Sequence, residues 1–345
     1  MMKNSVDASV LAVAADLIIR DYLCVKSGEQ VLITADAATD PRGVWALFEA
    51  ARVQKAIPSV VTIPQLPYQG SLSDPYIPEV AVAAGMSCDV WIDMTFPYMS
   101  GSKAHSEAMK KNRTRSLNLL DLGAGGISRL FAEVNFDRLF ELQGALDELI
   151  GGAVGKECHI TDTSGTDVRF TIGKMATKKL RHMTQPGTFT PPGSAVIYPE
   201  VDSVKGVVVT HAAFHKYFTL LKTPMRFKVD GQIREVTGGG SDLRLMEESL
   251  RRAAGGQFGK IIHFSHGFHP AAQFDGRSFN ENIRVPGNNA IGFGIPWWQP
   301  GGGENHPDGV VTNHSISIDG RQIVRDGALV DPPELLKLEQ ALRAA

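Results

Sequence analysis

The chain has 345 residues, of which 43% are hydrophobic and 21% charged, a composition typical of a folded globular protein. At this length we expect two domains, each with its own core. The formal net charge is −2 and the Lys and Arg residues are scattered, which argues against a nucleic-acid partner. The cysteines at 24, 88 and 158 have neither the number of a disulfide framework nor the spacing of a zinc knuckle.

The apolar run at residues 10–19 is interrupted by Asp16, and no extended basic region precedes it. It therefore predicts an amphipathic helix and not a signal or membrane segment. We accordingly expect a cytoplasmic protein that has no membrane partner.

The first half of the chain alternates between strand and helix patterns. Short apolar runs predict strands at residues 30–34, 59–63, 89–93 and 116–120, with helical periodicity at 42–55 and 73–84. Asp40-Pro41 is typical of an N-cap followed by proline at the first helical position. Such alternation indicates a parallel sheet covered by helices. A further helix at 136–150, ending at Gly151-Gly152, closes the predicted first domain, residues 1–155.

The second half has a different pattern. Residues 158–162 and 167–172 alternate in polarity around a turn, which predicts a hairpin, and further strands are expected at 207–210, 225–229 and 316–320. The predicted fold is therefore an N-terminal α/β domain with a parallel sheet, followed by a mainly antiparallel, β-rich domain of the α+β type at residues 156–345. We expect this second domain to bind a metal and to carry the active site.

Two segments of the second domain carry metal-ligand residues, His263 and His306-Pro307-Asp308. Two imidazoles and one carboxylate are the ligand set of a mononuclear ferrous site that leaves positions open for substrate and dioxygen. His306 and Asp308 are two residues apart, so in an extended segment their side chains point to the same side. The alternative interpretation is a solvated turn, in which Pro307 fixes φ and Asp308 makes a local hydrogen bond.

Two more histidines follow His263, at His266 and His269. In a helix, neighbouring pairs of these three would share a face and could bind a metal themselves, but Gly267 and Pro270 disfavour a helix. We therefore favour His263 as the ligand and predict that His266 and His269 act as a catalytic acid or base. Buried structural histidines are the alternative for both.

Substrate contacts are predicted for His105, after the third strand, and for Trp298, whose indole could stack on a flat ring. An exposed loop histidine and a core tryptophan are the respective alternatives. The glycine-rich segment 301–305 could form a lid over the site. His211, His215 and His314 are expected to be structural.

The second half also contains a series of short motifs, or landmarks, whose order and spacing are informative. These are Pro192-Gly193, Tyr198-Pro199, residues 202–206, Ile262-His263 with Pro270, His306-Pro307-Asp308, Asn313 and residues 316–320. In order and spacing they resemble the aminopeptidase T superfamily of metallopeptidases, and more closely its non-peptidase branch, the 2,5-dihydroxypyridine 5,6-dioxygenases. The resemblance covers most of the second domain, and the first domain is compatible with it.

The resemblance implies a single Fe(II) on His263, His306 and Asp308, and extradiol-type ring opening of a small hydroxylated aromatic substrate with O2. The peptidase branch would need additional glutamates for two metals, but this chain has Ser194 at one such place and no acid at residues 259–262. Residues 189–192 carry no histidine, which leaves the identity of the ring open. A hydrolase with Zn or Mn at the same ligands and a non-catalytic small-molecule-binding protein are the alternatives. We also expect a homo-oligomer.

Overall fold

The computed structural model describes residues 6–174, 179–296, 299 and 306–345. The chain divides into two compact units, which are Met1–Phe136 with Lys179–Pro191, and Asp137–Lys178 with Pro192–Ala345. By this division residues 137–155 belong to the second unit and 179–191 to the first, whereas the sequence placed the division at residue 155.

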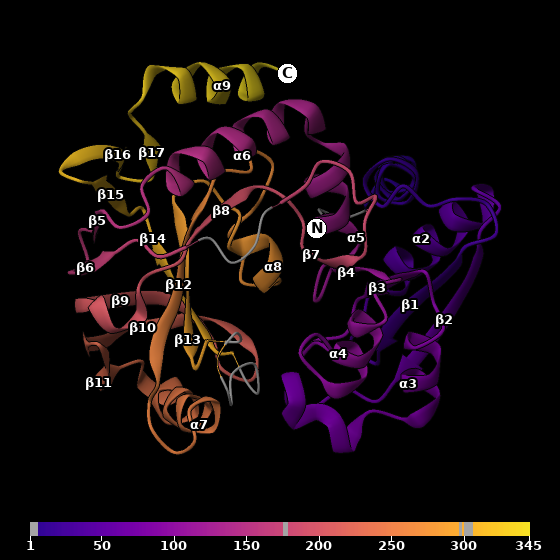
Figure 1. Cartoon of the computed structure of the whole chain (residues 1–345), viewed down its shortest axis with the longest axis horizontal. Helices are drawn as coiled ribbons and strands as arrows, with labels where there is room; N and C mark the ends of the chain where they lie inside the picture. Colours follow the sequence, from indigo (N-terminus) through magenta and orange to yellow (C-terminus); the bar gives the residue numbers. More distant parts are fainter. Residues whose placement is uncertain (1–5, 175–178, 297–298, 300–305) are drawn as a thin grey trace, which may run out of the picture. The chain divides into compact units, whose positions relative to one another are not determined.

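The first unit contains a five-stranded parallel sheet with the strand order β2-β1-β3-β4-β7 (Figure 1). Its strands are β1 (Gln30–Asp36), β2 (Ile57–Ile63), β3 (Val90–Asp93), β4 (Arg115–Asn118) and β7 (Gly187–Phe189). The first four were predicted from their apolar runs. The fifth was not predicted, because three residues are too few to show a period.

Helical segments connect these strands, as the alternating pattern predicted. They are α1 (Ala8–Asp16), η1 (Leu17–Tyr22), α2 (Pro41–Val53), η2 (Gly70–Tyr76), α3 (Glu79–Gly85), α4 (Lys103–Lys110), α5 (Ala124–Ile127) and η3 (Ser128–Ala132). Asp40 caps α2 by accepting a hydrogen bond from the backbone N–H of Arg42, and Pro41 occupies the first turn. Leu32 of β1 and Trp91 of β3 are buried in the core of this unit.

The second unit is built on a twelve-stranded sheet whose neighbouring strands pair antiparallel (Figure 1). Its main path has the order β17-β16-β15-β5-β6-β9-β14-β13-β12-β8, and β10 pairs with both β9 and β11. The strands are β5 (Glu157–Thr161), β6 (Asp167–Thr171), β8 (Ser194–Ile197), β9 (Lys205–Phe214), β10 (Phe218–Asp230), β11 (Gln232–Gly238), β12 (Lys260–Gly267), β13 (Asn288–Gly294), β14 (Asp308–Thr312), β15 (Ser315–Ile318), β16 (Arg321–Arg325) and β17 (Ala328–Leu329).

The helical segments of this unit are α6 (Phe136–Gly151), η4 (Val201–Ser203), η5 (Gly240–Asp242), α7 (Leu243–Ala253), α8 (Phe279–Asn282) and α9 (Pro333–Ala344). A parallel α/β sheet followed by a largely antiparallel sheet is the fold class predicted from the sequence, which is therefore confirmed.

Three neighbouring strands toward the β8 end of the large sheet, β12, β13 and β14, are largely buried. Every residue of β13 is buried. Phe293 on β13 stacks on Phe227 with ring centroids 4.6 Å apart, and Phe264 on β12 stacks on Phe170 at 4.5 Å. These aromatic pairs stabilise the strands from which the candidate site is built.

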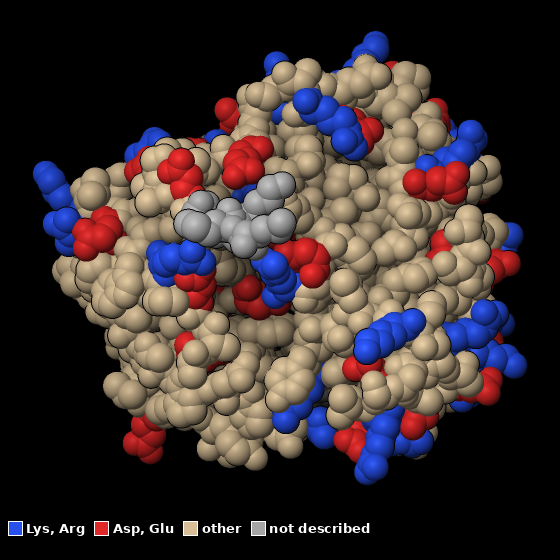
Figure 2. Space-filling view, turned by 180° about the vertical axis from the view of Figure 1, so that it is seen from behind, with Lys and Arg blue, Asp and Glu red and all other residues tan. Residues whose placement is uncertain are grey.

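The surface carries charges of both signs side by side. Figure 2 shows Lys and Arg intermixed with Asp and Glu over the face in view. Surface charges can also pair within one helix; Arg52 pairs with Glu49 on α2, and Arg244 with Glu248 on α7. Within the described residues, none of the helices combines the length and the apolarity needed to cross a membrane.

Candidate metal centre

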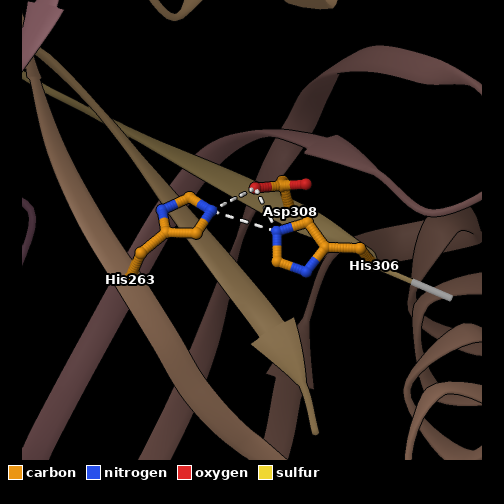
Figure 3. A group of neighbouring side chains, drawn as sticks. All are labelled: His263, His306 and Asp308. Atoms are coloured by element: carbon orange, nitrogen blue, oxygen red, sulfur yellow. Dashed lines mark hydrogen bonds and ion pairs between the residues drawn. The ribbon is translucent and has the colours of Figure 1, made fainter. Parts of the chain in front are cut away.

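The centre is built on one cross-strand row of the large sheet. His263 on β12 is paired in register with Gly292 on β13, and Gly292 is paired in register with Asp308 on β14. His306 precedes Asp308 by two residues, so the two side chains point to the same side of an extended segment. Figure 3 shows the side chains of His263, His306 and Asp308 pointing toward one another.

A β-bulge on β12 aims His263 at this row. Ile261 is paired with Phe293, but the next paired residue on β12 is His263, which faces Gly292, so the register shifts by one residue at Ile262. In an uninterrupted ladder Ile262 would face Gly292, and His263 would point to the opposite side of the sheet. The extra residue therefore places the imidazole on the same face as Asp308.

The three ligand groups are close enough to share one ion. The Nε2 atoms of His263 and His306 are 3.0 Å apart, and Asp308 Oδ1 lies 3.5 Å and 3.6 Å from them (Figure 3). Two atoms each bonded to a metal at about 2.1 Å are about 3.0 Å apart at a right angle and about 3.4 Å apart at a tetrahedral angle. The observed separations therefore fit a single small dication.

The electrostatics of the three groups also favour a cation. Asp308 is only 2% exposed, and burial raises the pKa of its carboxyl group well above the ordinary value. Burial lowers the pKa of His306 to about 4, so at neutral pH its imidazole is uncharged and has a lone pair available for a metal. A buried carboxylate beside two imidazoles, of which that of His306 is uncharged, would be stabilised by the positive charge of a bound dication.

No second cluster of this kind is found among the residues the structure describes. Within the described parts of the chain, the only three His, Cys, Asp or Glu groups that converge in this way are His263, His306 and Asp308, whose potential ligand atoms all lie within 4.8 Å of one another. The donor set of two nitrogens and one oxygen is the set that non-haem Fe(II) oxygenases use. The sequence had named these three residues from widely separated segments, and the structure brings them together.

A family model for 2,5-dihydroxypyridine 5,6-dioxygenase matches residues 21–331. The chain belongs to this family. No curated protein sequence matches the chain. The family assignment confirms the resemblance inferred from the landmarks of the second half.

Two solved structures resemble this dioxygenase-family chain along almost all of its length. A 2,5-dihydroxypyridine dioxygenase from Pseudomonas putida KT2440 is 17% identical, covers 96% of this chain and 99% of its own, and has a TM-score of 0.71. Wild-type AmpT from Thermus thermophilus is 14% identical, covers 94% of this chain and 99% of its own, and has a TM-score of 0.63. At these identities the likeness shows a shared fold.

In this dioxygenase-family chain His266 is bound to another histidine. Its Nδ1 lies 3.1 Å from Nε2 of His314, whose Nδ1 lies 2.9 Å from the carbonyl oxygen of Gly287. A carbonyl can only accept, so His314 carries its proton on Nδ1 and accepts from His266 at Nε2. Burial lowers the pKa of both rings, that of His314 to about 4, so each holds one proton. Nε2 of His266 is consequently left without a proton.

His269 follows β12 and is completely buried. Its backbone N–H donates to the carbonyl of Arg284 at 2.9 Å, and its Nδ1 accepts from the N–H of Ala271 at 3.3 Å. His263 and His266 lie on a strand, so the alternative of three histidines on one helix is wrong. The catalytic roles assigned to His266 and His269 stay predictions.

His105 lies in the first unit, on α4 and not in a loop, and only 6% of it is exposed. The alternative of an exposed loop histidine is therefore wrong. Its Nε2 is 3.4 Å from Thr188 Oγ1, its ring centroid is 5.7 Å from that of Trp91, and burial lowers its pKa to about 4. Its substrate role stays a prediction. Trp298 and the possible lid at 301–305 fall outside the described residues.

Two features of the centre were missed from the sequence. Gly292 shares the cross-strand row with two of the ligands, but a single glycine in an apolar strand carries no visible signal of such a place. The bulge at Ile262 was also missed, because it is defined by the pairing of β12 with β13 and not by β12 alone.

Proposed function

We propose that this protein is a mononuclear non-haem Fe(II) dioxygenase that opens the ring of a small hydroxylated aromatic or N-heteroaromatic compound, such as 2,5-dihydroxypyridine. The observation that carries the proposal is the convergence of two imidazoles and one buried carboxylate, in a chain that belongs to the 2,5-dihydroxypyridine 5,6-dioxygenase family. Extradiol-type cleavage with O2 as the second substrate is part of the proposal.

The three side chains would hold the iron in complementary ways. Asp308 contributes the negative charge that offsets part of the charge of a dication, and its burial strengthens that attraction. His306 has a lowered pKa and is ready to coordinate at neutral pH without first losing a proton. When bound, Fe(II) supplies the activation of O2 and of the hydroxylated ring that amino-acid side chains cannot provide.

His266 is the proposed proton acceptor. Its hydrogen bond to His314 holds the ring in one tautomer, with Nε2 unprotonated. A histidine held in this way can accept a proton at Nε2, such as one released from a substrate hydroxyl group, but cannot donate one from that atom. His314 would fix the orientation of this ring without contacting the substrate.

The two segments in which the peptidase branch would carry further glutamates support one metal and not two. Ser194 begins β8, and β12 begins with Lys260, Ile261 and Ile262, so neither segment offers the acid that a bridged pair of metals would need. This argues against a two-metal peptidase. A hydrolase that uses one Zn or Mn at the same ligands is the alternative that the test must exclude.

The test is metal content and oxygen uptake after anaerobic reconstitution with Fe(II). We expect about one iron per chain and O2 consumption with 2,5-dihydroxypyridine or a related hydroxylated ring. His306→Ala and Asp308→Ala should lose both. His159→Ala is the matched control, because His159 also pairs with an aspartate, Asp167 at 2.8 Å, but lies on the hairpin β5–β6.

Each outcome separates the alternatives. Two metals per chain would return the protein to the peptidase branch, and hydrolysis with Zn or Mn but no O2 uptake would favour a hydrolase. No metal in the parent chain would refute the centre and leave a small-molecule-binding role. An equal loss of iron and of O2 consumption in His159→Ala would show that the histidine substitutions act through folding and not through the metal centre.

A further inference from the structure

Gly292 lies under the point where the ligand side chains meet. A Cβ atom added to it would lie 2.4 Å from Nε2 of His263, and 2.5 Å from both Nε2 and Cε1 of His306. Ordinary van der Waals contact begins at 3.4 Å, so even the smallest side chain would collide with both rings. The colliding atoms include the two nitrogens that face the metal position.

The backbone does not explain this glycine. Gly292 is not among the glycines with positive φ, whereas Gly294 on the same strand has a φ of 131°. Gly292 pairs in regular register with Asp308 on one side, and on the other side it pairs with His263 directly after the bulge at Ile262; neither pairing needs a glycine with a positive φ. A glycine inside a central strand weakens it, so its presence calls for a reason other than chain conformation.

We propose that Gly292 is a positioning residue of the metal centre, whose missing side chain leaves the space in which His263 and His306 close on the ion. The inference rests on the proposed function in one respect, which is that these side chains hold a metal. Any side chain at this position would hold the two Nε2 atoms away from the point they share with Asp308 Oδ1.

The consequence for metal binding follows from the distances. To restore ordinary contact with an alanine methyl group, each ring end would have to retreat by about 1 Å, because 3.4 Å minus 2.4 Å is 1.0 Å. Metal–ligand bond lengths vary by only about 0.2 Å. The two rings therefore cannot avoid the methyl group and keep their bonds, so the affinity for the metal should fall by about 10- to 100-fold, as it does on loss of a group that orients a ligand.

The matched control is Gly43→Ala. Gly43 lies on α2, and a Cβ there would also meet side-chain ends, Ile127 Cδ1 at 2.9 Å and Met94 Cε at 3.2 Å, with no positive φ. Both variants add one methyl group to a crowded place. Only Gly292→Ala directs it at metal ligands.

The experiment measures binding of Co(II) and of Fe(II), the latter under anaerobic conditions, by metal content after gel filtration and by the visible absorption of the Co(II) protein. We expect Gly43→Ala to match the parent and Gly292→Ala to lose the metal and the spectrum. Unchanged metal content in Gly292→Ala would overturn the inference. A parent chain that binds neither metal would refute the proposed function itself, which is a distinguishable result.

A second measurement, made without metal, covers the case in which Gly292→Ala folds poorly. The melting temperature is compared for Gly292→Ala in the parent chain and in a His263→Ala/His306→Ala background. If the collision is with the imidazoles, alanine lowers the melting temperature in the parent and leaves it equal or higher in the background. The same loss in both would show that the added methyl group collides with something else.

Discussion

Asp308→Asn separates the two opposite effects of the buried carboxylate. The change keeps the size of the side chain and removes its charge. Without metal the carboxylate is a cost to the folded protein, because burial raises its pKa and no cation lies beside it among the described residues. With metal the same charge is a ligand, so we expect the variant to be as stable as the metal-free parent or more so, and to gain almost nothing from metal.

The size of the metal effect follows from linkage. A metal at a concentration 100 times its dissociation constant adds about 2.7 kcal/mol to the free energy of unfolding. If loss of the charged ligand weakens affinity by about 100-fold, the same concentration adds only about 0.4 kcal/mol. For a protein of this size the parent should gain about 5 °C in melting temperature on metal addition and the variant less than about 1 °C.

The assay is thermal unfolding with and without Fe(II) or Mn(II), repeated over a range of pH. A raised carboxyl pKa in the folded state means that the metal-free folded protein holds a proton that the unfolded chain has lost. The contribution of Asp308 is therefore favourable below the ordinary value of 3.8 and is lost as pH rises through the folded pKa. Asp308→Asn should lack this dependence of stability on pH. Equal metal stabilisation of variant and parent would refute the assignment of Asp308 as a ligand.

Three further predictions concern buried polar groups. The pKa of His105 is lowered to about 4 by burial, so the unfolded chain takes up a proton first and stability falls as pH drops from 6.5 toward 4. From pH 7 to pH 5 the free energy of unfolding, measured in urea, should fall by about 2 kcal/mol for this reason. His105→Gln should remove this pH dependence; an unchanged pH dependence in the variant would contradict its assignment to His105. Arg284 is buried and donates hydrogen bonds to the carbonyl oxygen of Pro192 at 3.0 Å and to Asn280. Arg284→Met should therefore lower the free energy of unfolding by about 3 kcal/mol. An unaltered urea midpoint would show that these hydrogen bonds do not stabilise the fold. In proton–nitrogen NMR spectra His266 should show its proton on Nδ1, and a proton on Nε2 would exclude it as the acceptor.

Much of the fold follows from local sequence. The apolar runs that became β1 and β3, and the Asp40-Pro41 start of α2, are features of a few neighbouring residues, and the structure keeps them. The same is true of the hairpin β5–β6. Local patterns predict such elements because burial on one or both faces imposes a period within each segment. The H-x-D spacing of His306 and Asp308 belongs to the same class of signal.

The family was also accessible from the sequence, through the order of landmarks in the second half. What the sequence could not supply is what depends on pairing between distant segments. The strand β7 joins the first sheet although it follows β5 and β6 of the second. His105 is buried on α4, whereas the sequence favoured an exposed loop for it. No local period records such choices.

The metal centre shows most clearly the difference between what the sequence determines and what the tertiary structure decides. The sequence by itself named His263, His306 and Asp308 as candidate ligands, with His266 and His269 as alternatives to His263. Only the tertiary structure decided how they meet, through the bulge at Ile262 that turns His263 to the right face and through the bare backbone of Gly292 that leaves room for the rings. The reason is physical. The chemistry of a ligand belongs to one side chain, whereas its direction and the space around it are set by the neighbouring strands.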